Sequence, residues 1–307
     1  MTSQTPVLGA KLLPPHPGPL HLRRARLHDR LARAVEGRAT AVVAGPGYGK
    51  TSLLARFLAE AGGDIVWYSL DPSDRDPWIF FRYLVHGFRE HAPEFGERIA
   101  WIWRDPRSRS EEPENLADVF MSEAEESLGG RFIVVLDQVH HLEGSGAAVR
   151  ALTRLLAYLP GTLHLVLAGR SAPEIGLTGL LAEGLATSLQ GDDLLFTRDE
   201  TKALLVDTFG LPLTGEALDG VQARTRGWVT ALQLLRQSAA LRAAPGLPEE
   251  FPSRTETEIF DYFTEKVLAA EADEVRAFLL GSSPPEVFDP DLLAEVLDDL
   301  DVRPILQ

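Results

Sequence analysis

The stretch AVVAGPGYGKTSLLARFLAE, residues 41–60, constrains the fold of this chain more than any other. An apolar strand pattern runs into a glycine-rich turn, and an amphipathic helix pattern follows at once. This order is typical of a loop that binds phosphate groups. Glycines let backbone N–H groups converge on phosphate oxygens, and the start of the helix adds partial positive charge. Ala44 stands where the motif usually has its first glycine.

The loop supplies a set of candidate nucleotide-binding residues: Gly45, Pro46, Gly47, Tyr48, Gly49, Lys50, Thr51 and Ser52. We expect the ammonium group of Lys50 to reach the β- and γ-phosphates of ATP, and the β-phosphate of ADP. We expect the hydroxyl group of Thr51 to coordinate Mg²⁺. Lysine is rare in this arginine-rich chain, so its occurrence at this position strengthens the interpretation.

A second apolar strand pattern, FIVVLD, ends at Asp137. A carboxylate at such a strand end, behind a phosphate loop, is typical of the residue that holds Mg²⁺. The next residue is Gln138, at a position where a nucleotide hydrolase usually has a second carboxylate that orients or deprotonates the attacking water. The sequence therefore predicts that nucleotide is bound but hydrolysed slowly or not at all. We take Asp137, Gln138 and Arg170 as the candidate catalytic residues.

Arg170 follows another apolar strand pattern, LHLVLAG. Ligands of parallel sheets lie at the carboxyl ends of the strands, so Arg170 is placed to sense a γ-phosphate. Its spacing is equally compatible with an ordinary surface arginine. His140 and His141 are adjacent, and in an extended chain they would point to opposite faces, which excludes a joint metal site. We expect one of them to make a polar contact near the site.

Strand and helix patterns alternate through the first two-thirds of the chain. This predicts an α/β fold in which a parallel sheet has helices on both faces. The expected strands are 40–45, 64–70, 132–137, 163–168 and 185–190, and the expected helices between them are 51–60, 78–91, 116–128 and 147–158. The segment 100–113 is interpreted as a polar surface insertion, in which Trp101 and Trp103 serve packing.

Beyond Gln190 the patterns are helical only, beginning with the capping box TRDE at 197–200. Further helices are expected at 215–226 and 228–241, and a proline-rich linker follows them. The chain ends within a helical pattern, which predicts a piece of a longer protein. The expected domains are an N-terminal segment at 1–39, a nucleotide-binding core at 40–193, a helical domain at 194–245 and a further domain at 254–307.

Composition limits the partners and the compartment. The chain has 307 residues, no cysteine and a formal net charge of −15, so it has no disulfide and no thiolate metal site. It has neither a long apolar run for a membrane span nor a secretory signal, and we expect a cytoplasmic protein without membrane contact. The arginine-rich segment 21–38 is interpreted as an amphipathic helix, with nucleic-acid contact as the alternative. The negative charge disfavours DNA binding by this chain itself.

Six motifs occur in order: GPGYGKTSLL, VWYSLDPSDRDPWIFFRYLV, VVLDQVHHL, LVLAGRSAP, DDLLFTRDE and RGWVTALQLL. Together they resemble the nucleotide-binding oligomerisation module of the MalT-type large LuxR regulators, which are signal-transduction ATPases with numerous domains. The resemblance covers nearly the whole chain, from Lys11 onward. It implies a P-loop ATPase core, a small helical domain and a winged-helix domain, truncated here, at 254–307.

The resemblance also implies roles for individual residues. The segment Leu22, Arg23 and Arg24 is similar to the one that borders the adenine. Trp228 lies in the Gly-Trp-Val stretch that closes over the nucleotide, with Val229 in place of a proline. His140 matches the histidine beyond the Mg²⁺ acid, and Arg170 matches the sensor arginine.

The same resemblance implies how the module works. ADP is held in a closed resting monomer, and ATP together with an inducer, a small molecule or a protein, opens it into a self-associated oligomer. The inducer and DNA are expected to bind through a C-terminal sensor domain and a helix-turn-helix domain that this sequence does not contain.

The functional hypothesis is therefore a nucleotide-gated switch in a transcription regulator. One alternative is an ATPase motor of the AAA-like type, which needs rapid turnover and is disfavoured by Gln138. A second is a small-molecule kinase, which needs an acceptor pocket with its own base. A third is a nucleotide-free scaffold, which the intact Lys50, Thr51 and Asp137 disfavour.

Overall fold

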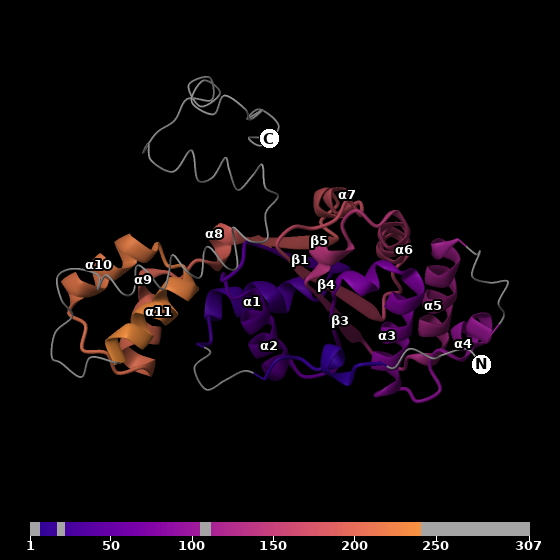
Figure 1. Ribbon diagram of the computed structural model, residues 1–307, viewed down its shortest axis with the longest axis horizontal. Helices are drawn as coiled ribbons and strands as arrows, with labels where there is room; N and C mark the ends of the chain where they lie inside the picture. The colour runs from indigo at the N-terminus through magenta and orange to yellow at the C-terminus, as the bar shows by residue number, and fades with distance from the viewer. Residues whose placement is uncertain (1–6, 17–21, 105–111, 241–307) are drawn as a thin grey trace, which may run out of the picture. The chain divides into compact units, whose positions relative to one another are not determined.

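A five-stranded parallel sheet forms the centre of the protein (Figure 1). The strands are β1 (Ala39–Val43), β2 (Asp64–Ser69), β3 (Phe132–Asp137), β4 (Leu163–Gly169) and β5 (Ala186–Gln190). Their order in the sheet is β2-β3-β4-β1-β5, and every neighbouring pair is parallel. The predicted α/β fold with a parallel sheet is confirmed, and each observed strand lies within two residues of its predicted bounds.

The computed structural model describes residues 7–16, 22–104 and 112–240. The chain consists of two compact units, Met1–Leu232 and Gln233–Gln307. The predicted winged-helix domain at 254–307 lies outside the described residues, as does the linker before it. The sheet and the helices around it belong to the first unit, in which the division between core and helical domain at residue 194 stays a prediction.

Helices cover both faces of the sheet (Figure 1). Those of the α/β region are α1 (Ala25–Ala34), α2 (Lys50–Ala61), α3 (Pro77–Arg89), α4 (Glu97–Arg104), α5 (Pro113–Ser127), α6 (Gly146–Ala157) and α7 (Leu177–Ala182). Short 3₁₀ turns supplement them at η1 (Gly9–Leu12), η2 (Pro72–Arg75) and η4 (Val139–Leu142). Helix α3 shows how the sequence sets a boundary, because the Asp76 carboxylate caps the Trp78 N–H and Pro77 occupies the first helical position.

The alternation of strand side chains divides the interior into two cores, because successive residues of a strand point to opposite faces. On β3, Val134 and Leu136 join α3, α5 and α6 in one core. Val135 joins α1 and α2 in the other core. Burial on both faces explains why the strands are almost uninterrupted apolar runs in the sequence.

Between β5 and residue 240, where the described part of the chain ends, the elements are helical only, as predicted for this stretch. They are α8 (Gly191–Leu194), α9 (Arg198–Lys202), the π-helical turn η5 (Ala203–Thr208), α10 (Gly215–Thr225) and α11 (Val229–Ala240). The capping box expected from TRDE is present, because the Thr197 hydroxyl accepts the Glu200 N–H and the Glu200 carboxylate accepts the Thr197 N–H. None of the described helices is long and apolar enough to cross a membrane.

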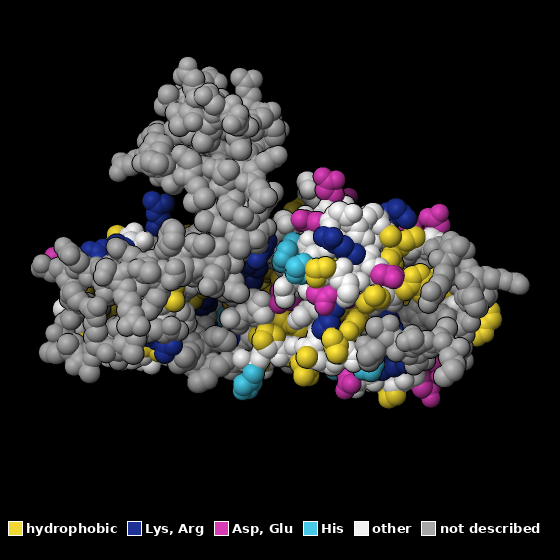
Figure 2. All heavy atoms as spheres, in the orientation of Figure 1, with side chains coloured by type: hydrophobic (Ala, Val, Ile, Leu, Met, Phe, Trp, Pro, Cys, Tyr) yellow, Lys and Arg dark blue, Asp and Glu magenta, His cyan; other side chains and the backbone are white. Residues whose placement is uncertain are grey.

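Two surface expectations have different outcomes. Helix α1 buries Leu27, Leu31 and Ala34 together with one polar residue, His28, so the amphipathic interpretation is confirmed. The indole of Trp101 on α4 is 71% exposed, and its predicted packing role is wrong. The side chain of Trp103 lies outside the described residues. On the face shown in Figure 2, acidic and basic side chains are interspersed rather than segregated.

A buried histidine links β4 to β1. The ring of His164 is fully buried, with Nδ1 2.9 Å from the Gly37 carbonyl oxygen and Nε2 3.0 Å from the Thr40 hydroxyl. Burial lowers the pKa of His164 below its ordinary value, and the hydrogen bond to Gly37 opposes this only partly. A neutral ring that donates from Nδ1 and accepts at Nε2 satisfies both partners.

This geometry predicts a pH dependence of stability. The folded-state pKa of His164 lies below the unfolded value of about 6.5. The contribution of the neutral ring to the free energy of unfolding is therefore complete above that pH. It is lost as pH falls, by up to about 1.4 kcal/mol per pH unit, since only the unfolded chain takes up the proton. Urea unfolding from pH 8 to pH 5 should show a shallower pH slope for His164→Asn than for the wild type. The exposed-residue control His86→Asn should keep the wild-type slope, and an unchanged slope in His164→Asn would contradict the assignment.

Candidate nucleotide site

The glycine-rich loop lies between the end of β1 and the first turn of α2. Gly47 and Gly49 have φ angles of 73° and 78°, values that favour glycine. Lys50, Thr51 and Ser52 form the first turn of α2, so the loop and the start of the helix present successive backbone N–H groups. The ring of Tyr48 contacts Gly45 and the start of α8. Pro46 completes the loop, which is half-buried throughout.

The side chain of Lys50 is held by two backbone carbonyl groups at the start of the loop. Its Nζ donates to the oxygens of Ala44 at 2.6 Å and Gly45 at 2.8 Å. Burial lowers the pKa of Lys50 to about 8, the charge of Asp137 opposes the shift, and the charge of Arg170 adds to it. The ammonium group is thus in the electrostatic field of both Asp137 and Arg170.

Thr51 and Asp137 meet across the sheet edge. The Thr51 hydroxyl donates to the Asp137 carboxylate, with Oγ1 and Oδ2 3.0 Å apart. Asp137 is only 4% exposed, and burial raises its pKa above the usual value. The hydrogen bond from Thr51, the backbone N–H of Gln138 and the charge of Lys50 all favour the ionised form and oppose this rise.

Gln138 follows the strand in a left-handed conformation, with φ of 62°. Its backbone N–H donates to the Asp137 carboxylate at 2.9 Å, and its side chain is exposed. The amide side chain is therefore accessible to solvent directly beside Asp137.

Arg170 and His140 lie together at the end of β4. The Arg170 backbone N–H donates a long hydrogen bond, 3.5 Å, to His140 Nδ1. Burial lowers the pKa of His140 to about 4, and the charges of His141, Arg170 and Lys50 add to this shift. The ring is therefore neutral at neutral pH, and it makes the polar contact that the sequence predicted for one of the two histidines.

The prediction that the side chains of His140 and His141 point to opposite faces of an extended chain is wrong. They lie in the 3₁₀ turn η4 rather than in a strand, and their ring centroids are 4.4 Å apart. Within the described ranges no group of three or more acidic or histidine side chains could hold a metal, so this pair is not part of such a cluster.

The beginning of α11 lies on the phosphate loop. The Thr230 hydroxyl donates to the Gly47 carbonyl oxygen at 2.9 Å, and a Cβ added to Gly49 would be 3.2 Å from the Val229 side chain. Trp228 precedes this helix and is partly buried, with its backbone N–H donating to the Thr225 carbonyl. The sequence placed Trp228 near the site, but nothing in it singled out Thr230.

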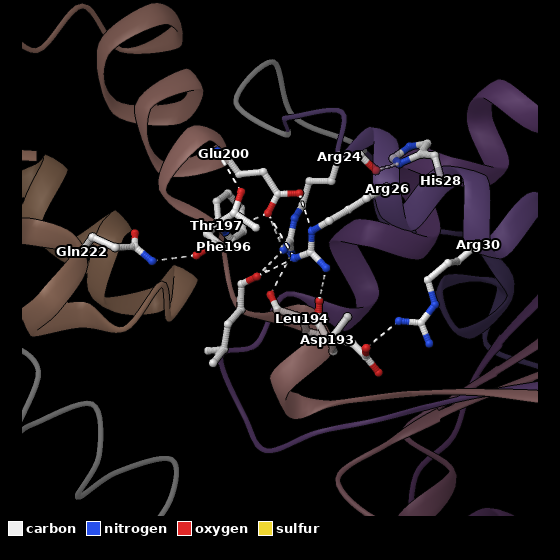
Figure 3. A network of polar contacts seen from close by, with 11 residues as sticks. Arg24, Arg26, His28, Arg30, Asp193, Leu194, Phe196, Thr197, Glu200 and Gln222 are labelled. Atoms are coloured by element: carbon white, nitrogen blue, oxygen red, sulfur yellow. Dashed lines mark hydrogen bonds and ion pairs between the residues drawn. The ribbon is translucent and has the colours of Figure 1, made fainter. Parts of the chain in front are cut away.

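Gly227 fixes where α11 begins. It has a φ angle of 78°, and a Cβ at this position would lie 2.1 Å from the Phe196 carbonyl oxygen. The two backbones are joined by a hydrogen bond of 2.8 Å from the Phe196 N–H to the Gly227 oxygen. The Gln222 amide donates to the Phe196 carbonyl at 2.9 Å (Figure 3). Only glycine permits so close an approach of the two chains.

Arg24, predicted to border the adenine, is buried in the same junction (Figure 3). Its guanidinium donates to the carbonyl oxygens of Leu194 and Leu195, each at 2.7 Å, and to Glu200 at 2.8 Å. It also lies over the Phe196 ring, 4.1 Å from the centroid. Desolvation lowers the pKa of Arg24, and Glu200 opposes the shift.

The neighbouring arginines are also engaged with acids or carbonyl groups. Arg26 donates to Glu200 and to the Asp193 and Leu195 carbonyls, and Arg30 donates to Asp193 (Figure 3). Exposed Arg23 pairs with Glu60 at 2.9 Å, and Leu22 beside it is half-buried. Arg24, Arg26 and Arg30 of this basic run thus hold α1 against the chain after β5. Their partners lie about 160–180 positions away, so the sequence pattern could not predict these contacts.

The donor set at the sheet edge fits a magnesium nucleotide. Mg²⁺ uses hard oxygen ligands, keeps several waters and is typically bound by one or two protein groups plus phosphates. Thr51 Oγ1 and Asp137 Oδ2, 3.0 Å apart, provide such oxygens beside the loop.

Comparisons with known proteins point to one group of regulators. No family model matches the chain. The HTH-type transcriptional regulator MalT of Vibrio cholerae is 28% identical over 287 residues, which cover 91% of this chain and 31% of that protein. MalT of Yersinia enterocolitica is 27% identical over 274 residues, covering 86% and 30% of the two chains. The chain spans about a third of the length of the curated relatives it matches.

Among solved structures, a signal transduction ATPase with numerous domains from Pyrococcus horikoshii, which has a tetratricopeptide repeat sensor, has a similar fold. The TM-score is 0.55 at 14% identity, and the alignment covers 98% of this chain and 40% of that chain. This similarity and the parallel sheet confirm the predicted P-loop ATPase fold. The resemblance of this chain to the nucleotide-binding module of the MalT-type regulators is likewise confirmed.

Proposed function

We propose that this chain is the nucleotide-binding switch module of a MalT-like transcription regulator. It binds ADP or ATP with Mg²⁺, with ADP as the resting ligand. The observation that supports this most directly is the convergence of the loop, the Thr51–Asp137 pair and Arg170 at one edge of the sheet. Self-association with ATP and an inducer, and DNA binding by other domains, follow from the resemblance.

The residues divide the binding task by chemistry. Loop N–H groups and the Lys50 ammonium hold phosphate oxygens, since Lys50 needs only to turn from the Ala44 and Gly45 carbonyls toward a stronger acceptor. Thr51 and Asp137 would hold Mg²⁺, which neutralises phosphate charge when bound. Arg170, whose charge acts on Lys50, would distinguish a terminal phosphate by its added negative charge.

Gln138 makes the module a holder of nucleotide rather than a motor. Its exposed amide can orient water but cannot accept a proton, and general-base help typically contributes about 10²–10⁴-fold in rate. Nδ1 of the neutral His140 ring already accepts a hydrogen bond from the Arg170 N–H.

An almost complete shift between two conformations requires about 5.5 kcal/mol of differential nucleotide affinity, so a second input besides the γ-phosphate is expected.

Lys50→Ala tests nucleotide binding. Mg·ADP at about a hundred times its dissociation constant should raise the wild-type free energy of unfolding by about 2.7 kcal/mol. The variant should lose most of this gain, because a charged hydrogen bond to phosphate contributes about 1.5–3 kcal/mol. Urea unfolding of each protein with and without Mg·ADP measures the difference. Lys202→Ala, at an exposed lysine of α9, should behave as the wild type, and a wild-type chain without any gain would contradict the proposal.

Gln138→Glu tests the holder hypothesis. The added carboxylate should increase the rate of ATP turnover by up to about 10²–10⁴-fold, while the affinity for Mg·ADP changes little because the substitution keeps Lys50, Thr51 and Asp137. Phosphate release under single-turnover conditions measures the rate, and calorimetry measures the affinity. Rapid hydrolysis by the wild type, unaffected by Gln138→Ala, would show that another residue is the base.

A further inference from the structure

The contact between α11 and the phosphate loop joins residues 183 positions apart in the sequence. It is made by a side-chain hydroxyl of Thr230 and a backbone carbonyl of Gly47, both half-buried. A Cβ added to Gly49 would lie 3.2 Å from the Val229 side chain, so Val229 faces Gly49 in the same place. The first two residues of α11 therefore lie beside the two loop glycines that have positive φ angles.

The peptide group between Gly47 and Tyr48 is one whose orientation can change in the loop. The orientation of the Gly47–Tyr48 peptide is set by ψ of Gly47 and φ of Tyr48. Gly47 has no Cβ to restrict its ψ angle, so on the Gly47 side this peptide is less constrained than one that follows another residue type. In a planar trans peptide the C=O and N–H bonds point in opposite directions, and the described chain has no cis peptide bond. Fixing the Gly47 oxygen toward Thr230 therefore fixes the Tyr48 N–H toward the opposite side.

The donor is itself held in place. Thr230 lies three residues after Gly227, whose backbone is in contact with Phe196. Phe196 is in turn held by Gln222 and by the stacked guanidinium of Arg24 (Figure 3). The hydroxyl is thus presented by a buried junction rather than by an independent surface helix.

We propose that Thr230 is a positioning residue for the phosphate loop, holding the Gly47–Tyr48 peptide in the orientation that binds phosphate. This inference depends on the proposed nucleotide binding and extends it. The start of α11 sets nucleotide affinity through the loop backbone, in addition to any direct contact with a ligand. The interaction is a single neutral hydrogen bond, so its removal should weaken Mg·ADP binding about two- to tenfold.

The test compares Thr230→Val, which removes the donor, with Thr230→Ser, which keeps it, in the full 307-residue chain. Thr153→Val is the matched control, because the half-buried Thr153 hydroxyl also donates to a carbonyl, that of Val149, but in α6. Thr230→Ala replaces Thr230→Val if valine packs poorly. Calorimetry with Mg·ADP gives the affinity. Hydrogen–deuterium exchange of the peptide 45–52 without added nucleotide gives the order of the loop.

The expected result is weaker Mg·ADP binding and faster exchange of the loop in Thr230→Val, with both restored in Thr230→Ser and unchanged in Thr153→Val. If the wild type binds Mg·ADP and Thr230→Val binds it equally well, the inference is overturned while the proposed function stands. Weaker binding without faster exchange, or a failure of serine to restore both, also overturns it. If the wild type binds neither Mg·ADP nor Mg·ATP, the proposed function fails and Thr230 has no phosphate to position.

Discussion

The parallel pairing of β4 between β1 and β3 is the constraint on which the rest of the site depends. Val43, the last residue of β1, pairs with Gly169, and Asp137, the last residue of β3, pairs with Ala168. The three strands thus end at the same level, and the segments that leave them meet at one edge. The loop, Arg170 and Asp137 are positioned by the sheet, whose interior is buried on both faces. Such a scaffold holds charged groups in place without relying on flexible loops.

The electrostatics of this edge favour an anionic ligand even though the chain is acidic as a whole. Lys50 experiences the charges of Asp137 and Arg170, so two cations and one carboxylate share a partly buried site. The net charge of −15 belongs to the whole chain. Four arginines in and just before α1, Arg23, Arg24, Arg26 and Arg30, pair with Glu60, Glu200 and Asp193, which neutralises most of the basic charge of this segment. Positive charge available for phosphate is therefore concentrated where the backbone N–H groups are.

The junction around Phe196 connects this edge to the helices that follow the sheet. Arg24 lies on one side of the Phe196 ring, and the backbone of Gly227 lies against its peptide groups. Three residues further on, Thr230 contacts the loop. Hydrogen bonds and close contacts thus connect the loop, the start of α11 and the junction around Phe196.

The sequence predicted the parts of this site that depend on local pattern. Unbroken apolar runs located the strands, and the residues at their ends, Asp137 and Arg170, were assigned correctly to the sheet edge. The pairing order of the strands was not predictable, because it depends on contacts between strands far apart in the sequence. His140 and His141 were misplaced because a 3₁₀ turn, not the strand, contains them. The contacts of Arg24 and Thr230 depend on partners about 170–180 residues away, which no local pattern encodes.

Nucleotide retention at the loop between β1 and α2 is the property on which the proposed switch depends. It is tested most directly by identifying the small molecule released when the purified, undialysed protein is denatured. Chromatography of the supernatant should show close to one ADP per chain, because a site bounded by the loop and α11 is expected to release ADP slowly. A supernatant without adenine nucleotide, from a protein that also takes up no labelled ADP or ATP, would contradict nucleotide binding by this chain.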